Sequence, residues 1–207
     1  MRTLVVASQK GGVGKTTIAG HLAVMAESKG AGPVALIDTD PQGSLSSWWN
    51  ERQAETPAFA SVDIANLSDH LKQLEKAGIK LAIIDTPPAV TETIRKVLAV
   101  ADLVLIPTRP SPHDLRAVGS TVELVEAAGK RMVFVINGAA QRAKITGEAA
   151  IALSQHGTVA PVTLYQRTDF AASMIDGRTA QEIDPGSRSA GEVTNLWNYV
   201  SAQIHKI

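Results

Sequence analysis

The segment SQKGGVGKTTIAG, from Ser8 to Gly20, constrains the fold of this chain more than any other stretch. It follows a short apolar run and leads into a helical apolar pattern that begins at Ile18. Glycines in such a loop let backbone N–H groups converge on phosphate oxygens, and the helix N-terminus adds the positive end of its dipole. The order strand, glycine-rich loop, helix therefore predicts a phosphate-binding loop in an α/β protein.

The loop residues have separate expected tasks. Lys15 is expected to neutralise charge at the β- and γ-phosphates, and the Thr16 hydroxyl is expected to bind Mg²⁺. The usual motif would place its first glycine at position 9, where this chain has Gln9, and Lys10 adds a second lysine. The loop is thus a variant of the common phosphate-binding motif. The expected nucleotide contacts are Gly11, Gly12, Val13, Gly14, Lys15, Thr16 and Thr17.

Short apolar runs recur along the chain between stretches long enough for crossover helices. Continuous apolar runs are typical of parallel strands that are covered on both faces. We therefore expect a doubly wound α/β fold, with a mostly parallel sheet flanked by helices. The length of 207 residues suits one domain, spanning 1–207. The expected strands are Thr3–Ser8, Val34–Asp40, Leu81–Pro87, Asp102–Thr108, Met132–Gly138 and Val159–Tyr165.

Three further features carry local expectations. The stretch Arg178–Ala190 is the best candidate for a loop, and Gly191–Ile207 reads as a terminal helix. That helix is expected to bury Val193, Leu196, Trp197 and Val200. A tryptophan pair, Trp48 and Trp49, is expected to serve packing rather than ligand binding.

Acidic residues follow two of the predicted strands. Asp85 ends the run LAIID, where a carboxylate at the carboxyl end of a strand can reach the magnesium shell, as in a Walker B motif. Asp38 and Asp40 alternate in the stretch LIDTDPQG, so they need not share a face. One of them could hold magnesium through water while the other orients an attacking water. Either could instead cap the following helix.

Composition narrows the function classes. With 20 basic and 20 acidic residues, whole-chain charge gives no sign of a nucleic-acid partner, so DNA binding would need a local patch or oligomerisation. The absence of cysteine excludes disulfides, thiolate zinc sites and iron-sulfur clusters. No apolar run reaches the roughly 18 residues of a membrane helix, and the start shows no leader pattern. We expect a cytoplasmic protein without membrane contact.

Five stretches together resemble the ParA family of partition ATPases with a deviant Walker A motif. They are KGGVGKTT, DTDPQG, IIDTPP, PTRPSPHDLRAVGS and IDPGSRSAGEV, and they span nearly the whole chain. The short form is similar to the small plasmid partition ATPases of the ParF type. The resemblance implies a protein that binds ATP and Mg²⁺, forms a homodimer on ATP binding and associates with nucleoid DNA without sequence specificity. A centromere-binding adaptor of the ParB or ParG kind would stimulate an otherwise slow hydrolysis and release the DNA.

The resemblance also implies roles for individual residues. Lys10 would be the signature lysine that reaches the phosphates of the other subunit, and Asp40 would position the water, so Lys10, Lys15 and Asp40 are the catalytic candidates. Asp38 and Asp85 would serve the magnesium with Thr16.

Three more positions resemble functional positions of the family. Asn137 would contact the nucleobase, although an asparagine at a strand end is also a common turn former. Arg167 and Arg188 lie near positions where family members carry DNA-contacting arginines, and a solvated surface role is the alternative for both.

Relatives with the same loop have other functions. A nitrogenase reductase-like protein would need cluster-binding cysteines, so that class is excluded. A MinD-like ATPase that cycles on membranes would need a basic amphipathic C-terminal helix, which the end NYVSAQIHKI does not offer. A small metabolic ligase or kinase would turn over ATP without DNA or a protein partner. A ParA-like ATPase that positions a cytosolic protein cargo on the nucleoid stays open, because sequence barely separates it from a plasmid partition protein.

Overall fold

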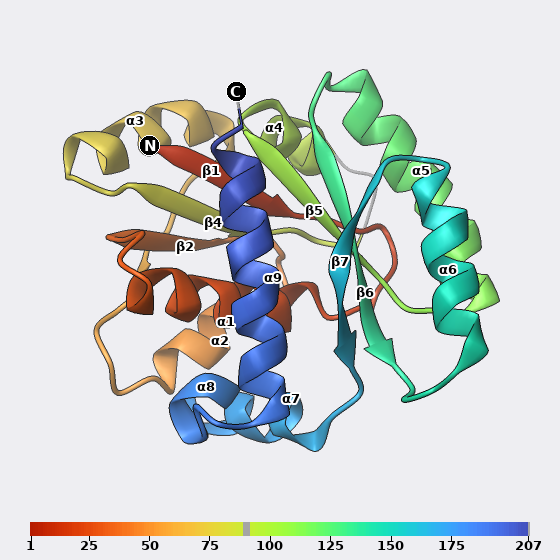
Figure 1. The fold of residues 1–207 in the computed structure, drawn as a ribbon. Helices are drawn as coiled ribbons and strands as arrows, with labels where there is room; N and C mark the ends of the chain where they lie inside the picture. The colour runs from red at the N-terminus through yellow and green to blue at the C-terminus, as the bar shows by residue number, and fades with distance from the viewer. Residues whose placement is uncertain (89–91, 207) are drawn as a thin grey trace.

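A seven-stranded sheet runs through the computed structural model, which describes residues 1–88 and 92–206. The strand order is β3-β2-β4-β1-β5-β6-β7, and every pair is parallel (Figure 1). The central strand β1 therefore has β4 and β5 as its neighbours. The strands are β1 Arg2–Val6, β2 Val34–Asp38, β3 Ala58–Phe59, β4 Leu81–Asp85, β5 Leu103–Thr108, β6 Met132–Ala139 and β7 Thr158–Tyr165.

Helices cover both faces of this sheet (Figure 1). One face packs against α1, α2 and α9, and the other packs against α3, α4, α5 and α6. The α-helices are α1 Lys15–Ser28, α2 Ser44–Asn50, α3 Leu67–Lys76, α4 Glu92–Ala99, α5 Pro112–Ala127, α6 Lys144–Ser154, α7 Thr168–Ser173, α8 Ala180–Ile183 and α9 Arg188–Ile204. Short 3₁₀ turns are η1 Ile64–Asn66 and η2 Met174–Asp176.

The central strand shows why the sequence has continuous apolar runs. Side chains alternate between the faces of a strand, so Leu4 and Val6 join the core beneath α1 and α9. Val5 and Ala7 join the core on the other face, beneath α4 and α5. Because both faces of the strand are covered, it needs no polar residues at alternate positions, and its sequence is a continuous apolar run.

The predicted parallel α/β architecture is confirmed, and each of the six expected runs forms a strand. The burial of the Val193, Leu196, Trp197 and Val200 stripe in α9 is also confirmed. The two-residue strand β3 was not predicted, because so short a run carries no periodicity.

The expected loop Arg178–Ala190 is wrong in part. It contains α8, whose capping box joins Thr179 to Glu182, and the first turn of α9, which Ser187 caps through the Ala190 N–H. Both caps are short polar patterns that precede a helix, and they were the sequence signal for these two starts. The terminal helix therefore begins at Arg188 and not at Gly191.

The carboxyl ends of three neighbouring strands meet at one edge of the sheet. The register pairs Val6 of β1 with Asp85 of β4, and Asp38 of β2 with the same Asp85. The glycine-rich loop leaves β1 at this edge, so the loop and two of the predicted aspartates are brought together by strand register alone.

A buried histidine ties α1 to the segment around α8. His21 is 1% exposed, its Nδ1 lies 2.8 Å from the Thr17 carbonyl oxygen, and its Nε2 accepts a hydrogen bond from the Ala180 N–H. These partners fit a neutral ring that carries its proton on Nδ1. Burial lowers the pKa of His21 from 6.5 to about 4.

Acidification should therefore destabilise the protein through His21. Between pH 6.5 and about 4 the unfolded chain binds a proton that the folded chain refuses, so the free energy of unfolding falls as pH falls, by up to about 3 kcal/mol. Asp85 acts in the opposite direction, because its pKa is raised in the fold. Urea unfolding across this range should consequently be compared between the wild type and His21→Gln, whose side chain is neutral throughout. Equal pH slopes for the two proteins would contradict the assignment.

Candidate nucleotide-binding site

The phosphate-binding loop joins β1 to α1 through two left-handed glycines. Gly12 has φ 72° and Gly14 has φ 91°, a region that side chains rarely tolerate. A Cβ on Gly14 would lie 2.3 Å from Nδ2 of Asn137. Gly14 also accepts the first helical hydrogen bond, from the Ile18 N–H at 2.9 Å. The N–H groups of the first turn of α1 are thereby left to face a ligand.

Gln9 explains how the loop does without a glycine at that position. Its side-chain amide donates to the carbonyl oxygen of Ser120 at 2.8 Å, and its backbone N–H donates to Thr121 Oγ1 at 3.1 Å. Both acceptors lie on α5, more than 100 residues away. The start of the loop is therefore fastened to α5, a role that the sequence motif did not suggest.

Thr16 and Asp85 form a close polar pair beside the loop. The Thr16 hydroxyl donates to Oδ2 of Asp85 at 2.6 Å, and Asp85 is 1% exposed. Burial raises the pKa of Asp85 to about 7, although the hydrogen bond from Thr16 opposes the shift. A buried carboxylate in this condition gains from a nearby cation.

The donor set fits magnesium bound in part by the nucleotide. Among residues 1–88 and 92–206, no group of three or more His, Cys, Asp or Glu side chains could hold a metal by itself. Mg²⁺ commonly takes one or two protein oxygens and completes its shell with phosphate oxygens and water. Thr16 and Asp85 offer two such oxygens beside the loop.

Lys15 lies inside the site, whereas Lys10 lies outside it. Lys15 is 7% exposed and lines a cavity of about 800 Å³ together with Gly11, Gly12, Thr16 and Asp40. Burial lowers the pKa of Lys15, and the charges of Asp85 and Asp40 oppose this. Lys10 is exposed and does not line the cavity. The two lysines of the loop thus occupy different environments.

Asp38 and Asp40 also differ in their surroundings. Oδ2 of Asp38 accepts hydrogen bonds from the Leu45 and Ser46 N–H groups and from the Ser46 hydroxyl, at 2.9 to 3.0 Å. Oδ1 of Asp38 accepts from the Asp40 N–H. Asp38 therefore accepts from N–H groups of the first turn of α2, close to the capping alternative that the sequence left open, although the N-cap position itself is Gly43. Asp40 keeps only a local bond from the Gln42 N–H and faces the cavity.

Asn137 lies between the loop and a second cavity. Its Nδ2 donates to the carbonyl oxygen of Val13 at 2.7 Å, which fixes the loop to β6. The adjoining cavity, of about 250 Å³, is lined by both polar and apolar side chains. It includes Thr17, His21, Arg109, Asn137, Tyr165 and Phe170. A contact from Asn137 to a nucleobase stays a prediction.

The two arginines predicted to bind DNA are in unlike surroundings. Arg167 is 16% exposed and forms an ion pair with Glu192, with Nε 2.9 Å from Oε1, and its guanidinium lies over the ring of Tyr165. Its charge is already compensated inside the fold. Arg188 is exposed at the first turn of α9.

Comparison with known proteins decides the family. Residues 4–180 match the model of the CobQ/CobB/MinD/ParA nucleotide binding domain. The chain belongs to this family. It is 31% identical over 202 residues to the maintenance of carboxysome distribution protein A of Halothiobacillus neapolitanus, covering 93% of each chain. It is also 31% identical over 183 residues to protein ParA of Rhizobium radiobacter, covering 83% of this chain and 82% of that one.

Solved structures support the same fold. The apo McdA of Cyanothece superposes with a TM-score of 0.77 at 20% identity, covering 99% of both chains. The septum site-determining protein MinD of Pyrococcus horikoshii, complexed with Mg-ADP, superposes with a TM-score of 0.79 at 17% identity, covering 100% of this chain and 99% of that one. The P-loop NTPase fold and the resemblance to the ParA family are therefore confirmed. Within the described residues, no helix is both long and apolar enough to cross a bilayer.

Proposed function

We propose that the chain is an ATP-dependent partition or positioning ATPase that dimerises with ATP, binds DNA without sequence specificity and is released when a partner stimulates hydrolysis. The observation that carries this proposal is that Lys15 and Thr16 line the phosphate cavity, Asp85 accepts a hydrogen bond from the Thr16 hydroxyl, and Lys10 is exposed outside the cavity. A second lysine outside the cavity is unnecessary for binding a nucleotide within one subunit. It fits a site that a second copy completes.

The described residues divide the chemistry among them. Lys15 and the N–H groups of the loop would hold the β- and γ-phosphates, and Thr16 with Asp85 would hold Mg²⁺, which lowers the charge on the phosphates when bound. Asp40, the aspartate that faces the cavity, would orient the attacking water. Asp38 would serve the magnesium only indirectly, because its oxygens already hold α2 and Asp40. Without a partner we expect hydrolysis to be slow.

The cargo has two candidates. Plasmid or chromosome partition with a ParB- or ParG-like adaptor is the first, supported by the likeness to protein ParA. Positioning of a protein compartment is the second, supported by the likeness over 93% of the chain to a carboxysome distribution protein. The gene beside this one should encode the adaptor. Purified adaptor that stimulates ATP hydrolysis and binds a DNA site would favour partition, whereas an adaptor that binds a protein assembly would favour positioning.

DNA binding should be gated by ATP and should depend on Arg188 more than on Arg167. The guanidinium of Arg167 is paired with Glu192, whereas Arg188 is exposed. Loss of one phosphate contact from each protomer should lower the log–log salt slope by roughly 2 for Arg188→Ala. Fluorescence anisotropy with duplexes of unrelated sequence, at several salt concentrations, measures this slope.

Lys76→Ala is the matched control for Arg188→Ala. Lys76 is an exposed lysine at the last position of α3, which covers the opposite face of the sheet from α9. The salt slope of Lys76→Ala should equal that of the wild type. Equal DNA affinity with ATP, with ADP and without nucleotide would refute the dependence of DNA binding on ATP. A loss of affinity in Arg188→Ala for some DNA sequences only would indicate contacts with bases instead of phosphates.

A further inference from the structure

The phosphate cavity has two outer walls that are far apart in the sequence. One wall comes from the segment of Asp40 and α2, which contributes Asp40, Gln42, Ser44, Ser47, Trp48 and Glu51. The other comes from α7 and η2, which contribute Ala171, Met174 and Ile175. We call these the α2 wall and the η2 wall. A residue that joins them would decide whether they move together.

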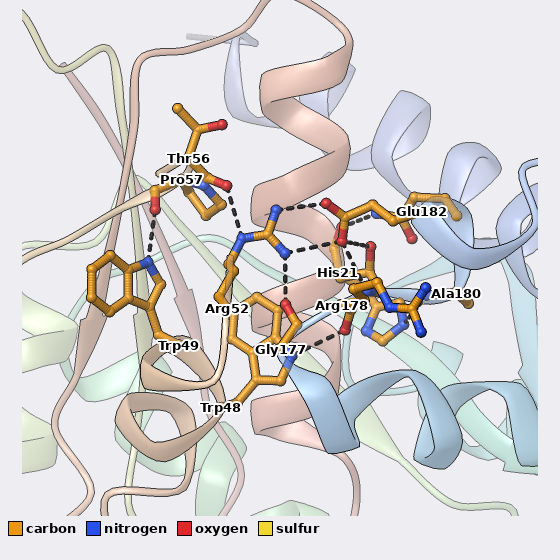
Figure 2. Close-up of polar contacts among 12 residues, drawn as sticks. His21, Trp48, Trp49, Arg52, Thr56, Pro57, Gly177, Arg178, Ala180 and Glu182 are labelled. Carbon is orange, nitrogen blue, oxygen red and sulfur yellow. Dashed lines mark hydrogen bonds and ion pairs between the residues drawn. The ribbon is translucent and has the colours of Figure 1, made fainter. Parts of the chain in front are cut away.

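Arg52, just beyond the C-terminus of α2, makes this junction (Figure 2). Its side chain is 3% exposed and its guanidinium donates to three segments. Nη1 donates to the Gly177 carbonyl oxygen at 2.7 Å, Nε donates to the Thr56 carbonyl oxygen at 2.9 Å, and Nη1 and Nη2 bind both carboxylate oxygens of Glu182 at 3.0 and 2.6 Å. One side chain thereby links the end of α2 to the end of η2 and to α8.

The backbones of the two walls also touch beside Arg52. A Cβ on Gly177, which has φ 75°, would lie 2.3 Å from the backbone nitrogen of Arg52. The indole N–H of Trp48 donates to the Arg178 carbonyl oxygen at 3.0 Å, and Trp48 is 4% exposed. Figure 2 shows the bond from Trp48 to Arg178 beside the hydrogen bonds of the Arg52 guanidinium to Thr56, Gly177 and Glu182. The two walls therefore cannot move past each other here without breaking these hydrogen bonds.

The opposite end of α2 is fixed to the catalytic segment. Asp38 accepts from N–H groups of the first turn of α2 and also from the Asp40 N–H, so Asp40 and the start of α2 share one anchor. The seven-residue helix α2 thus connects the Asp38 anchor at its start to Arg52 just beyond its end. A shift at Asp40 would reach the η2 wall by this route if α2 moved as a rigid element.

The chemistry of the pair favours positioning over stability. Burial by itself would raise the pKa of Glu182, but hydrogen bonds from Arg52 and Thr179 outweigh it and lower the pKa. The Arg52 side chain is buried while the Glu182 side chain is 28% exposed, and desolvation and solvent screening both reduce the net attraction of such a pair, so it is weak evidence for a stabilising role. What a guanidinium supplies is a planar fork of donors in fixed directions, which a lysine cannot reproduce.

We propose that Arg52 is a positioning residue that makes the α2 wall and the η2 wall one body, so that both respond together when a nucleotide reaches Asp40. The inference rests on the proposed ATP hydrolysis, because Asp40 is the group that it positions. Arg52 itself contacts neither the nucleotide nor the metal. It acts on Asp40 through α2 and on the η2 wall through Gly177.

Hydrogen exchange and single-turnover hydrolysis test this together. In the wild type, a non-hydrolysable ATP analogue should protect both segments 44–52 and 168–183. In Arg52→Ala and Arg52→Lys, segment 44–52 should keep its protection while segment 168–183 loses most of it. Hydrolysis at saturating ATP should slow about tenfold in both variants, because Asp40 would be displaced by a fraction of an ångström. The affinity for ADP should stay within about twofold of the wild type, because Lys15 and the loop are untouched.

Arg178→Ala is the matched control. Arg178 lies in the same segment, its guanidinium pairs with the exposed Asp176, and its backbone carbonyl, which Trp48 binds, is unchanged by the substitution. It should behave as the wild type in every measurement. If Arg52→Ala does not fold by circular dichroism, Glu182→Gln replaces it, since this variant removes the charge but keeps an acceptor for Thr179.

Three results would overturn the inference. They are wild-type behaviour of Arg52→Lys, joint protection of both walls in a folded Arg52→Ala, and lowered thermal stability without any change in hydrolysis or exchange. A wild type that never hydrolyses ATP would instead count against the proposed function, and the exchange measurement would still decide whether Arg52 couples the walls.

Discussion

Replacing Gly14 with alanine is expected to weaken nucleotide binding by up to roughly 100-fold, the loss that a displacement of about 1 Å can cause at a positioned site. The new Cβ would lie 2.3 Å from Asn137 Nδ2, at a backbone φ of 91°. Asn137 holds the loop through the Val13 carbonyl oxygen, so either the loop or the amide must move. Titration with a fluorescent ATP analogue measures the loss.

A matched variant separates the collision from backbone strain. Gly78 has φ 94°, nearly the value at Gly14, but a Cβ there would meet no atom within 4 Å. Gly78→Ala should lose about 1 to 2 kcal/mol of stability from the left-handed backbone and no nucleotide affinity. Gly14→Ala combined with Asn137→Ala should regain part of the affinity. An unchanged affinity in Gly14→Ala alone would show that the loop adapts freely, and the proposed geometry of the site would be wrong.

The sequence predicted those parts of the site that depend on local order along the chain. The glycine loop, Lys15 and Thr16 lie within one strand-loop-helix unit, so their neighbourhood follows from covalent connection. Asp85 could be added because carboxyl ends of parallel strands meet at one edge, and the register of Val6 with Asp85 bears this out.

Contacts between distant segments could not be predicted. Arg52 and Glu182 are 130 positions apart, and nothing in either segment signals the other. Gln9 binds α5 at a separation of 111 residues, so its place in the loop looked like a mere departure from the motif. Arg167 looked like a free cation because Glu192 lies 25 residues further on, in α9. Each case depends on tertiary packing, which local patterns do not encode.

Asp38 and Asp40 show a limit of a different kind. Two carboxylates separated by one residue at a strand end have the same local signature, and the sequence could not assign the cap to one of them. The structure distinguishes them by their donors, since Asp38 accepts four hydrogen bonds and Asp40 accepts one, from the Gln42 N–H. The freer carboxylate is the better candidate to hold a water molecule.

Lys10 raises the question of which subunit its charge serves. The side chain is exposed, and its backbone N–H is held by the Ser8 hydroxyl at 3.3 Å, so the loop fixes where the side chain starts but not where it ends. Lys15 already serves the cavity of its own subunit. A lysine carries a compact charge on a long flexible stem, which suits contact with phosphates across an interface.

Mixing two inactive variants should therefore restore hydrolysis. Lys10→Ala and Asp40→Ala are each expected to be inactive as homodimers. In a mixed dimer, the Lys10→Ala subunit keeps its own Asp40 and receives a lysine from its partner, so one of the two sites works. Random pairing makes half of the dimers mixed, and recovery should reach roughly a quarter of the wild-type rate. The rate is measured after the two proteins are mixed with ATP, and a tag on each variant verifies that mixed dimers form. If Lys10 served its own nucleotide, each site of the mixed dimer would lack one essential group, and inactive mixed dimers would refute the assignment across the interface.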